Sequence, residues 1–256
     1  MSGTRRTSAT AGPESTAAQA RAWALDALRG LAVAGMVIYH LLWDASFFGL
    51  LRLDMTRGPW LWVARAGGSL FLWLVGVSMA LAAARWPASE RDRRWRSRGL
   101  KLWGWALVIT LATRLGLGDA YVRFGILHLI GTALVLAPVL WRLRAVGTGL
   151  AAALAAAGLV AGRLAAGAGW AWTVPLGITP PAFHSVDYWP VLPWMAAVAL
   201  GVWSGPHVGR WLPAPAPPPR VWRPVCWLGR HSLVVYLLHQ PVLLALFGLM
   251  GLLQKP

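Results

Sequence analysis

Residues 27–48 read ALRGLAVAGMVIYHLLWDASFF, and this stretch decides the class of fold. It is long enough to cross a bilayer, because a membrane-spanning helix needs about 20 mostly apolar residues. Similar apolar runs recur along the chain, and together they give seven candidate spans. They cover residues 27–48, 59–84, 100–117, 122–141, 147–166, 188–205 and 226–253. The sequence therefore predicts an all-α, polytopic membrane helix bundle with about seven transmembrane helices.

The composition excludes the other common classes of protein. Of the 256 residues, 57% are hydrophobic and only 12% are charged, whereas about 25% are charged in a typical soluble domain. The single cysteine, Cys226, cannot build a disulfide scaffold. The net charge of +16 comes from basic residues that lie between apolar runs, so we expect no nucleic-acid partner. Membrane lipids are the expected surroundings.

Charge distribution gives the orientation of the predicted bundle. With the N-terminus in the cytoplasm, well over half of the 24 Lys and Arg residues fall on the cytoplasmic side, as the positive-inside rule requires. Residues 1–20 are rich in Ser, Thr, Ala and Gly, and we expect a disordered cytoplasmic tail there. Residues 21–256 form one transmembrane domain.

The first span carries the clearest set of ionisable residues, and such residues inside a membrane are functional candidates. Asp26, Arg29, His40 and Asp44 fall close to one face of a helix with 3.6 residues per turn. His40 and Asp44 are one turn apart, so the carboxylate could orient the imidazole ring. The competing interpretation makes Asp26 and Arg29 a helix-start pair near the headgroups, and Asp44 the end of the helix.

Further polar residues lie at a similar predicted depth, in the outer half of the bundle or near its midplane. For His128 and His239, a histidine with satisfied hydrogen bonds is as good an interpretation as a functional one, and Asp187 suits a helix N-cap equally well. The catalytic candidates are His40, Asp44, Arg29 and His128. The candidates for substrate binding are Arg65, Asp187, Trp194, His239 and Gln240.

General acid–base chemistry fits this set better than metal binding. The spacing lacks HxxxH and HExxH patterns, and the polar residues are spread over several helices, so we expect no metal. A histidine near an aspartate can take a proton from a hydroxyl or amine nucleophile, and a transient acetyl-histidine is the alternative. His128 or Arg65 would stabilise the oxyanion. No GxSxG, Walker A or GxGxxG pattern is present.

A basic segment from Arg85 to Lys101 precedes the third span. Its first interpretation is a determinant of topology. The alternative is a patch that binds an anionic lipid or a phosphorylated cytoplasmic ligand.

Four motifs resemble the heparan-α-glucosaminide N-acetyltransferase catalytic-domain family, in its small bacterial branch, within the wider group of transmembrane acyltransferases. They are ALDALRGLA at residues 24–32 with Met36 and His40, FGILHLIG at 124–131, Asp187 with LPW at 192–194, and LGRHSL at 228–233 followed by YLLHQP at 236–241. Their order along nearly the whole chain makes the resemblance specific. Arg29, ten residues and then His40 also resemble the Arg-x10-His pattern of the O-acyltransferases.

The resemblance implies an enzyme that moves an acetyl group from acetyl-CoA to a sugar or glycan acceptor at the outer face of a bacterial cytoplasmic membrane. It gives His40 the catalytic role and Arg29 a supporting one, and it leaves a homodimer open. The phosphates of CoA would bind the basic segment, with Arg94, Arg96, Arg98 and Lys101 as candidates. Two alternatives from other classes are a carrier or flippase-like protein without covalent chemistry and a structural membrane partner.

Overall fold

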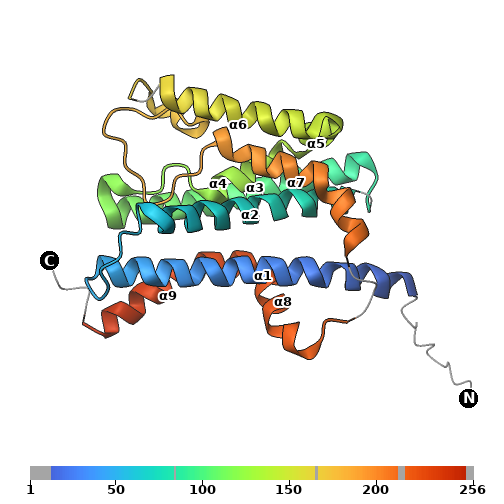
Figure 1. The fold of residues 1–256 in the computed structure, drawn as a ribbon, viewed down its shortest axis with the longest axis horizontal. Coiled ribbons are helices and arrows are strands. Elements are labelled where there is room, and N and C mark those ends of the chain that lie inside the picture. The colour runs from blue at the N-terminus through green and yellow to red at the C-terminus, as the bar shows by residue number, and fades with distance from the viewer. Residues whose placement is uncertain (1–12, 84, 165–166, 213–216, 252–256) are drawn as a thin grey trace, which may run out of the picture. The chain divides into compact units, whose positions relative to one another are not determined.

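The computed structural model describes residues 13–83, 85–164, 167–212 and 217–251, which fold almost entirely into helices (Figure 1). The α-helices are α1 (Pro13–Phe47), α2 (Gly58–Ala83), α3 (Ala88–Leu117), α4 (Ile126–Val135), α5 (Ala137–Arg142), α6 (Gly147–Leu164), α7 (Val191–Trp211), α8 (Arg223–Arg230) and α9 (Ser232–Leu249). Short 3-10 helices are η1 (Gly118–Ala120), η2 (Leu143–Val146), η3 (Ala171–Leu176) and η4 (Arg220–Trp222). Of the predicted tail at residues 1–20, residues 1–12 lie outside the described part, and α1 begins at Pro13.

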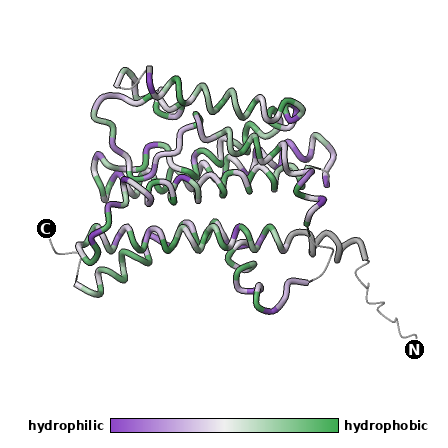
Figure 2. Tube along the Cα trace, in the orientation of Figure 1, coloured by the Kyte–Doolittle hydropathy of each residue, from purple (hydrophilic) through white to green (hydrophobic). Residues whose placement is uncertain are grey.

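Six helical segments are long and apolar enough to cross a membrane, and this confirms the polytopic helix bundle. They are Trp23–Phe47, Gly58–Ala83, Ala88–Ala120, Ala137–Arg163, Val191–Trp211 and Ser232–Leu249, and Ile126–Val135 is a shorter apolar helix. In Figure 2 the hydrophobic colour runs along the helices, and much of the hydrophilic colour lies at their ends. Many large apolar side chains are exposed, among them Leu111, Leu115 and Phe47. A surface of this kind suits lipid chains rather than water.

The predicted span at 122–141 is interrupted. Helix α4 ends at Val135, and α5 begins at Ala137, with Pro138 in its first turn. Proline has no N–H to continue a helix, and its ring collides with the carbonyl four residues earlier. The ten residues of α4 are therefore too few to qualify as a span, and α5 counts with α6 in the segment Ala137–Arg163.

The predicted span at 226–253 is also divided. Helix α8 ends at Arg230, His231 has φ −101° and ψ 20°, and α9 begins at Ser232. Only α9 is long and apolar enough to cross a membrane. Its 18 residues correspond to about 27 Å at 1.5 Å per residue, close to the thickness of the hydrocarbon core.

The chain divides into two compact units. The terminal unit comprises Met1–Thr56 and Trp211–Pro256, and the central unit comprises Arg57–Arg210. In the terminal unit, α1 packs against α8 and α9. The crossing of α1 and α8 is very close, because a Cβ on Gly30 would collide with the carbonyl of Val225, and one on Gly229 with the carbonyl of Asp26. Only glycine allows backbones to approach in this way.

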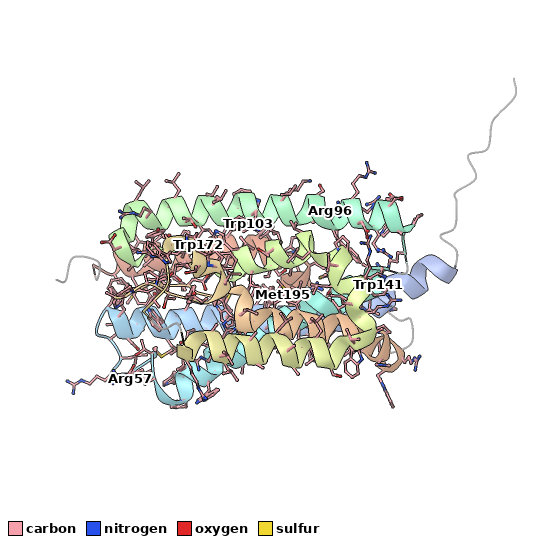
Figure 3. All side chains as sticks on the ribbon, turned by 90° about the horizontal axis from the view of Figure 1, so that it is seen from above. Arg57, Arg96, Trp103, Trp141, Trp172 and Met195 are labelled. Atoms are coloured by element: carbon pink, nitrogen blue, oxygen red, sulfur yellow. The ribbon has the colours of Figure 1, made fainter. Side chains whose placement is uncertain are left out.

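The central unit has its own apolar core. Leu72 of α2, Leu129 of α4 and Val198 of α7 are fully buried there, and Met195 is 2% exposed. Helix α3 packs along α4. Helices α2 and α7 meet where Trp73 Nε1 donates a hydrogen bond of 2.9 Å to Ser204 Oγ. This packing leaves the outer side of α3 at an edge of the central unit (Figure 3).

Candidate functional site

Helix α1 of the terminal unit separates its four polar residues into two groups. Arg29 Nη1 lies 3.0 Å from Asp26 Oδ1 in a salt bridge near the start of the span. His40 lies eleven positions after Arg29, which is about 16 Å along the helix axis. Asp26 and Arg29 thus form a pair near the start of the span Trp23–Phe47, although α1 itself begins earlier, at Pro13. His40 and Asp44 form a second group near the C-terminal end of α1.

The ring of His40 is held by its own helix. Its Nδ1 lies 2.9 Å from the carbonyl oxygen of Met36. A carbonyl can only accept a hydrogen bond, so Nδ1 is the donor, and in the tautomer with its proton on Nδ1 the lone pair is on Nε2. Within the described part of the chain, Nε2 has no hydrogen-bond partner. That lone pair is available to a ligand.

His239 of α9 repeats this arrangement beside His40. Its Nδ1 lies 2.7 Å from the carbonyl oxygen of Tyr236, so its lone pair is also on Nε2. That Nε2 atom is buried and has no partner among the described residues. The centroids of the two imidazole rings are 4.8 Å apart, and their planes meet at 69°. The sequence placed the two histidines at a similar depth, and the structure brings them into contact.

Asp44 binds Gln240 rather than His40. The Gln240 amide nitrogen Nε2 donates to both carboxylate oxygens of Asp44, each at 3.0 Å, and Asp44 is only 4% exposed. The expectation that Asp44 orients the His40 ring needs correction, because the carbonyl of Met36 does this instead. The buried Gln240 Oε1 has no partner among the described residues.

Helices α1 and α9 thus gather hydrogen-bond acceptors without donors: Nε2 of His40, Nε2 of His239 and Oε1 of Gln240, next to the Asp44 carboxylate. Buried polar atoms without partners are costly, and such atoms commonly meet a water or a ligand. The complementary ligand carries hydroxyl or amine hydrogens. An imidazole lone pair facing such a group can remove its proton. We refer to His40, Asp44, His239 and Gln240 as the histidine site.

The ring nitrogens of His128, in the central unit, have different hydrogen-bond partners from those of His40 and His239. The Gly125 N–H donates to its Nδ1 at 3.2 Å, and its Nε2 lies 3.4 Å from Thr110 Oγ1, which itself donates to the carbonyl of Val122. Both ring nitrogens are therefore engaged, and the ring is 2% exposed between Trp103 and Phe124. These contacts favour a structural role over the predicted catalytic one. Sequence reasoning missed Thr110, whose only signal is a hydroxyl within the apolar run of α3.

Asp187 caps a helix, but not the one that follows it in sequence. Its Oδ2 accepts a hydrogen bond of 3.1 Å from the N–H of Ile126, in the first turn of α4. The neighbouring backbone is joined as well, since the Trp189 N–H donates to the carbonyl of Phe124 at 2.8 Å. A negative charge at a helix N-terminus is favourable. Asp187 therefore holds the entry of α4 against the segment before α7.

The other two substrate-binding candidates, Arg65 and Trp194, lie in the central unit. Arg65 is exposed, and its guanidinium lies 5.7 Å from the centre of the Trp62 ring. Trp194 packs on Trp189 with ring centroids 4.4 Å apart. Both have partners typical of a membrane-interface residue.

The four candidates for binding CoA phosphates divide between two faces of α3. Arg94 donates to Glu90 at 2.8 and 3.1 Å, and its guanidinium lies 3.7 Å from the centre of the Trp86 ring. It shares with Arg98 a recess that also holds Trp86 and Trp95, which we call the Trp86 recess. Arg96 and Lys101 line a different face.

Two further observations concern other possible reactive groups, namely a bound metal ion and the side chains of Cys226 and Tyr188. Among the described residues, no group of three His, Cys, Asp or Glu side chains could hold a metal ion. Cys226 is buried, and burial raises the pKa of its thiol, so the thiolate form is disfavoured. Burial likewise raises the pKa of Tyr188 to about 12, and its hydroxyl donates to the carbonyl of Val174. Neither group supplies a nucleophile.

The fold and the histidine site define a multi-pass membrane protein whose polar atoms can accept protons within a helix pair. The family of this protein follows from a comparison with family models. Residues 21–241 match the model described as heparan-alpha-glucosaminide N-acetyltransferase, catalytic. Because the match covers most of the chain, the protein belongs to this family, as the sequence motifs predicted. Neither a curated protein nor a solved structure matches the chain.

Proposed function

We propose that the protein is an integral membrane acetyltransferase that moves an acetyl group from acetyl-CoA to a sugar or glycan acceptor. The observation that carries the proposal is the pair of contacting imidazoles, His40 and His239, each of which uses Nδ1 on a backbone carbonyl and has no hydrogen-bond partner for Nε2 among the described residues. The family supports acetyl-CoA as the donor. The proposal places the protein in a bacterial cytoplasmic membrane, with the acceptor at the outer face.

In this mechanism His40 is the general base. Its Nε2 removes a proton from the acceptor hydroxyl or amine as the acceptor oxygen or nitrogen bonds to the thioester carbon. The carbon–sulfur bond then breaks, and the CoA sulfur takes the proton from the His40 imidazolium, which becomes neutral again. Such a base contributes about 10²–10⁴-fold to a rate.

The other members of the histidine site support this step. Asp44 lies one turn from His40, so its negative charge favours the imidazolium that forms during the reaction. The hydrogen bonds from Gln240 hold that carboxylate in place. The acceptor atoms on His239 and Gln240 bind further hydroxyl or amine hydrogens of the acceptor. Arg29, paired with Asp26 about 16 Å along α1 from His40, has a positioning role.

The donor needs a separate binding place for its phosphates and adenine. The Trp86 recess offers cationic Arg94 and Arg98 next to the rings of Trp86 and Trp95. Guanidinium groups bind phosphates. The recess itself is too small for the nucleotide, because its free volume is about 20 Å³ and Trp95 is 4% exposed. We therefore assign only the phosphates of CoA to its arginines, Arg94 and Arg98.

The test is an assay of the full chain in proteoliposomes with acetyl-CoA labelled in the acetyl group. Sugars and glycans are supplied as acceptors, and both CoA release and labelled product are measured. We expect acceptor-dependent release by the native chain and about 10²–10⁴-fold less by His40→Ala. The matched control is His231→Ala, since His231 is exposed and stacks on Trp227.

Two results would contradict the proposal. One is acetyl-CoA binding without any acceptor-dependent CoA release, which would indicate a carrier. The other is a native rate of transfer by His40→Ala, which would remove His40 from the mechanism. Adding acetyl-CoA and acceptor to opposite sides of the vesicle tests the assignment of sides.

A further inference from the structure

The basic segment of α3 has two faces with different surroundings. On the first, Arg91, Arg94 and Arg98 lie with Trp86 and Trp95 in the Trp86 recess. The second, which we call the open face, is lined by Ser89, Asp92, Arg93, Arg96, Ser97, Leu100 and Lys101. In Figure 3, Arg96 marks this segment of α3, at an edge of the central unit.

The three cations of the open face form no ion pairs with the described residues. In the described part of the chain, Arg93, Arg96 and Lys101 have no ion pair. Asp92, the acid on this face, is held by Arg91 at 3.1 Å. The face therefore presents three free positive charges together with the hydroxyl groups of two serines.

An exposed apolar stripe continues the open face along α3. Its members are Leu100 at 64%, Leu107 at 54%, Val108 at 55%, Leu111 at 62% and Leu115 at 81% exposed. Their spacing of three, four and seven residues keeps them on the side of the helix that carries Arg93 and Arg96. A Cβ on Gly104, which lies within the stripe, would meet nothing within 4 Å.

The stripe covers most of the depth of the hydrocarbon layer. From Leu100 to Leu115 the helix rises about 23 Å, against about 30 Å for the bilayer core. Arg96 lies about 6 Å beyond Leu100, and Arg93 about 10 Å beyond it. With the stripe against acyl chains, these arginines stand at the level of the lipid phosphates, and Lys101 reaches the same level by extending its side chain.

We propose that the open face of α3 binds the phosphate of an anionic phospholipid whose acyl chains lie along the apolar stripe. A soluble phosphorylated ligand would use the cations but leave the stripe without a role, whereas a lipid uses both. Arg93, Arg96 and Lys101 contact the phosphate, and Ser89 and Ser97 add hydrogen bonds. This site is separate from the Trp86 recess, to whose arginines we assign the CoA phosphates.

The test measures thermal unfolding of the full chain in detergent by its intrinsic fluorescence, since it contains 18 Trp. Phosphatidylglycerol or phosphatidylcholine is titrated in, and native mass spectrometry counts bound lipid. The triple variant Arg93→Gln/Arg96→Gln/Lys101→Gln is compared with Arg52→Gln/Arg57→Gln/Arg163→Gln, which removes three exposed charges elsewhere. We expect phosphatidylglycerol to raise the melting temperature of the native chain and of the control, and the open-face variant to lose at least two thirds of that shift.

A second part of the experiment distinguishes binding of a lipid phosphate from binding of the CoA phosphates. CoA is titrated into the same three proteins, and its apparent affinity is expected to change less than threefold. Lost CoA binding with a full lipid shift in the open-face variant would mean that this face binds the nucleotide, and the proposal would fail. It would also fail if both triple variants lost the shift equally. If the open-face variant does not fold, the test uses the native chain alone. Equal rises in its melting temperature with phosphatidylglycerol and with phosphatidylcholine would then overturn the proposal.

Discussion

His128 in the central unit and the His40–His239 pair in the terminal unit are histidines with opposite hydrogen bonding. His128 receives an N–H on one ring nitrogen and faces a threonine hydroxyl with the other. His40 and His239 each use Nδ1 on a carbonyl of their own helix, and their Nε2 atoms lack partners among the described residues. His128 is 2% exposed, whereas His40 and His239 are only partly buried, so deeper burial does not mark the histidines that we propose to be reactive. The difference lies in which ring nitrogen remains available.

After His40→Ala, replacing His239 should give the largest effect, and it tests whether the two histidines of the pair act together. We expect His239→Ala to lower the rate of acetyl transfer about 100-fold, because the acceptor loses a proton-accepting contact. Comparing kcat with KM distinguishes the roles: a rise in KM alone indicates binding of the acceptor. Native kinetics in this variant would mean that the pair is no more reactive than His128.

Replacing His128 should change stability instead of chemistry. We expect His128→Leu to lower the free energy of unfolding by about 1–3 kcal/mol, since the Gly125 N–H would be left buried without an acceptor. The measurement is thermal unfolding in detergent, with activity expressed per folded molecule. If activity per folded molecule fell as far as in His40→Ala, His128 would take part in the reaction and would not be a structural histidine.

Asp44→Asn separates charge from hydrogen bonding within the histidine site. Asparagine still accepts from the Gln240 amide through its carbonyl oxygen, but it no longer favours an imidazolium at His40. We expect transfer to slow about tenfold, or about 1.4 kcal/mol, with little change in melting temperature. Gln240→Leu serves as the comparison, because it leaves the charge and removes the hydrogen bonds. A large loss of stability in Asp44→Asn would make Asp44 structural.

The smallest effect is expected at Asp187. Asp187→Ala should cost about 1 kcal/mol of stability, because it removes the cap on the N–H of Ile126. Asp187→Asn should recover most of that loss, since the amide oxygen can accept the same hydrogen bond. Activity measured at low temperature should stay near native in both variants. A strong loss of activity in a well-folded Asp187→Asn variant would indicate that Asp187 binds the substrate.

The sequence predicts most of the helices because long apolar runs have few alternatives in a bilayer. The two interruptions depend on single residues. Pro138 could have been read as the end of a helix, since proline removes a backbone donor. The break at His231 lies two residues after Gly229, where α8 crosses close to Gly30 of α1, and that tertiary contact has no signal in the local sequence.

The sequence predicted the members of the histidine site but not their contacts. Spacing along one helix placed His40 and Asp44 on a common face, and depth selected His239 and Gln240. Their pairing depends on how α9 packs on α1, and the same spacing argument wrongly gave Asp44 the task of orienting the His40 ring. Asp187 caps a helix that begins 61 residues earlier, so an N-cap rule applied to its own helix could not find this contact.

The discontinuous terminal unit has a consequence for biosynthesis. Helix α1 is made well before α8 and α9, which pack against it. During translation Asp44 must enter the membrane long before the Gln240 amide exists to bind it, and Gly30 waits for the backbone of α8. Until α8 and α9 emerge, the nascent chain therefore lacks the Gln240 amide that binds Asp44 in the folded protein.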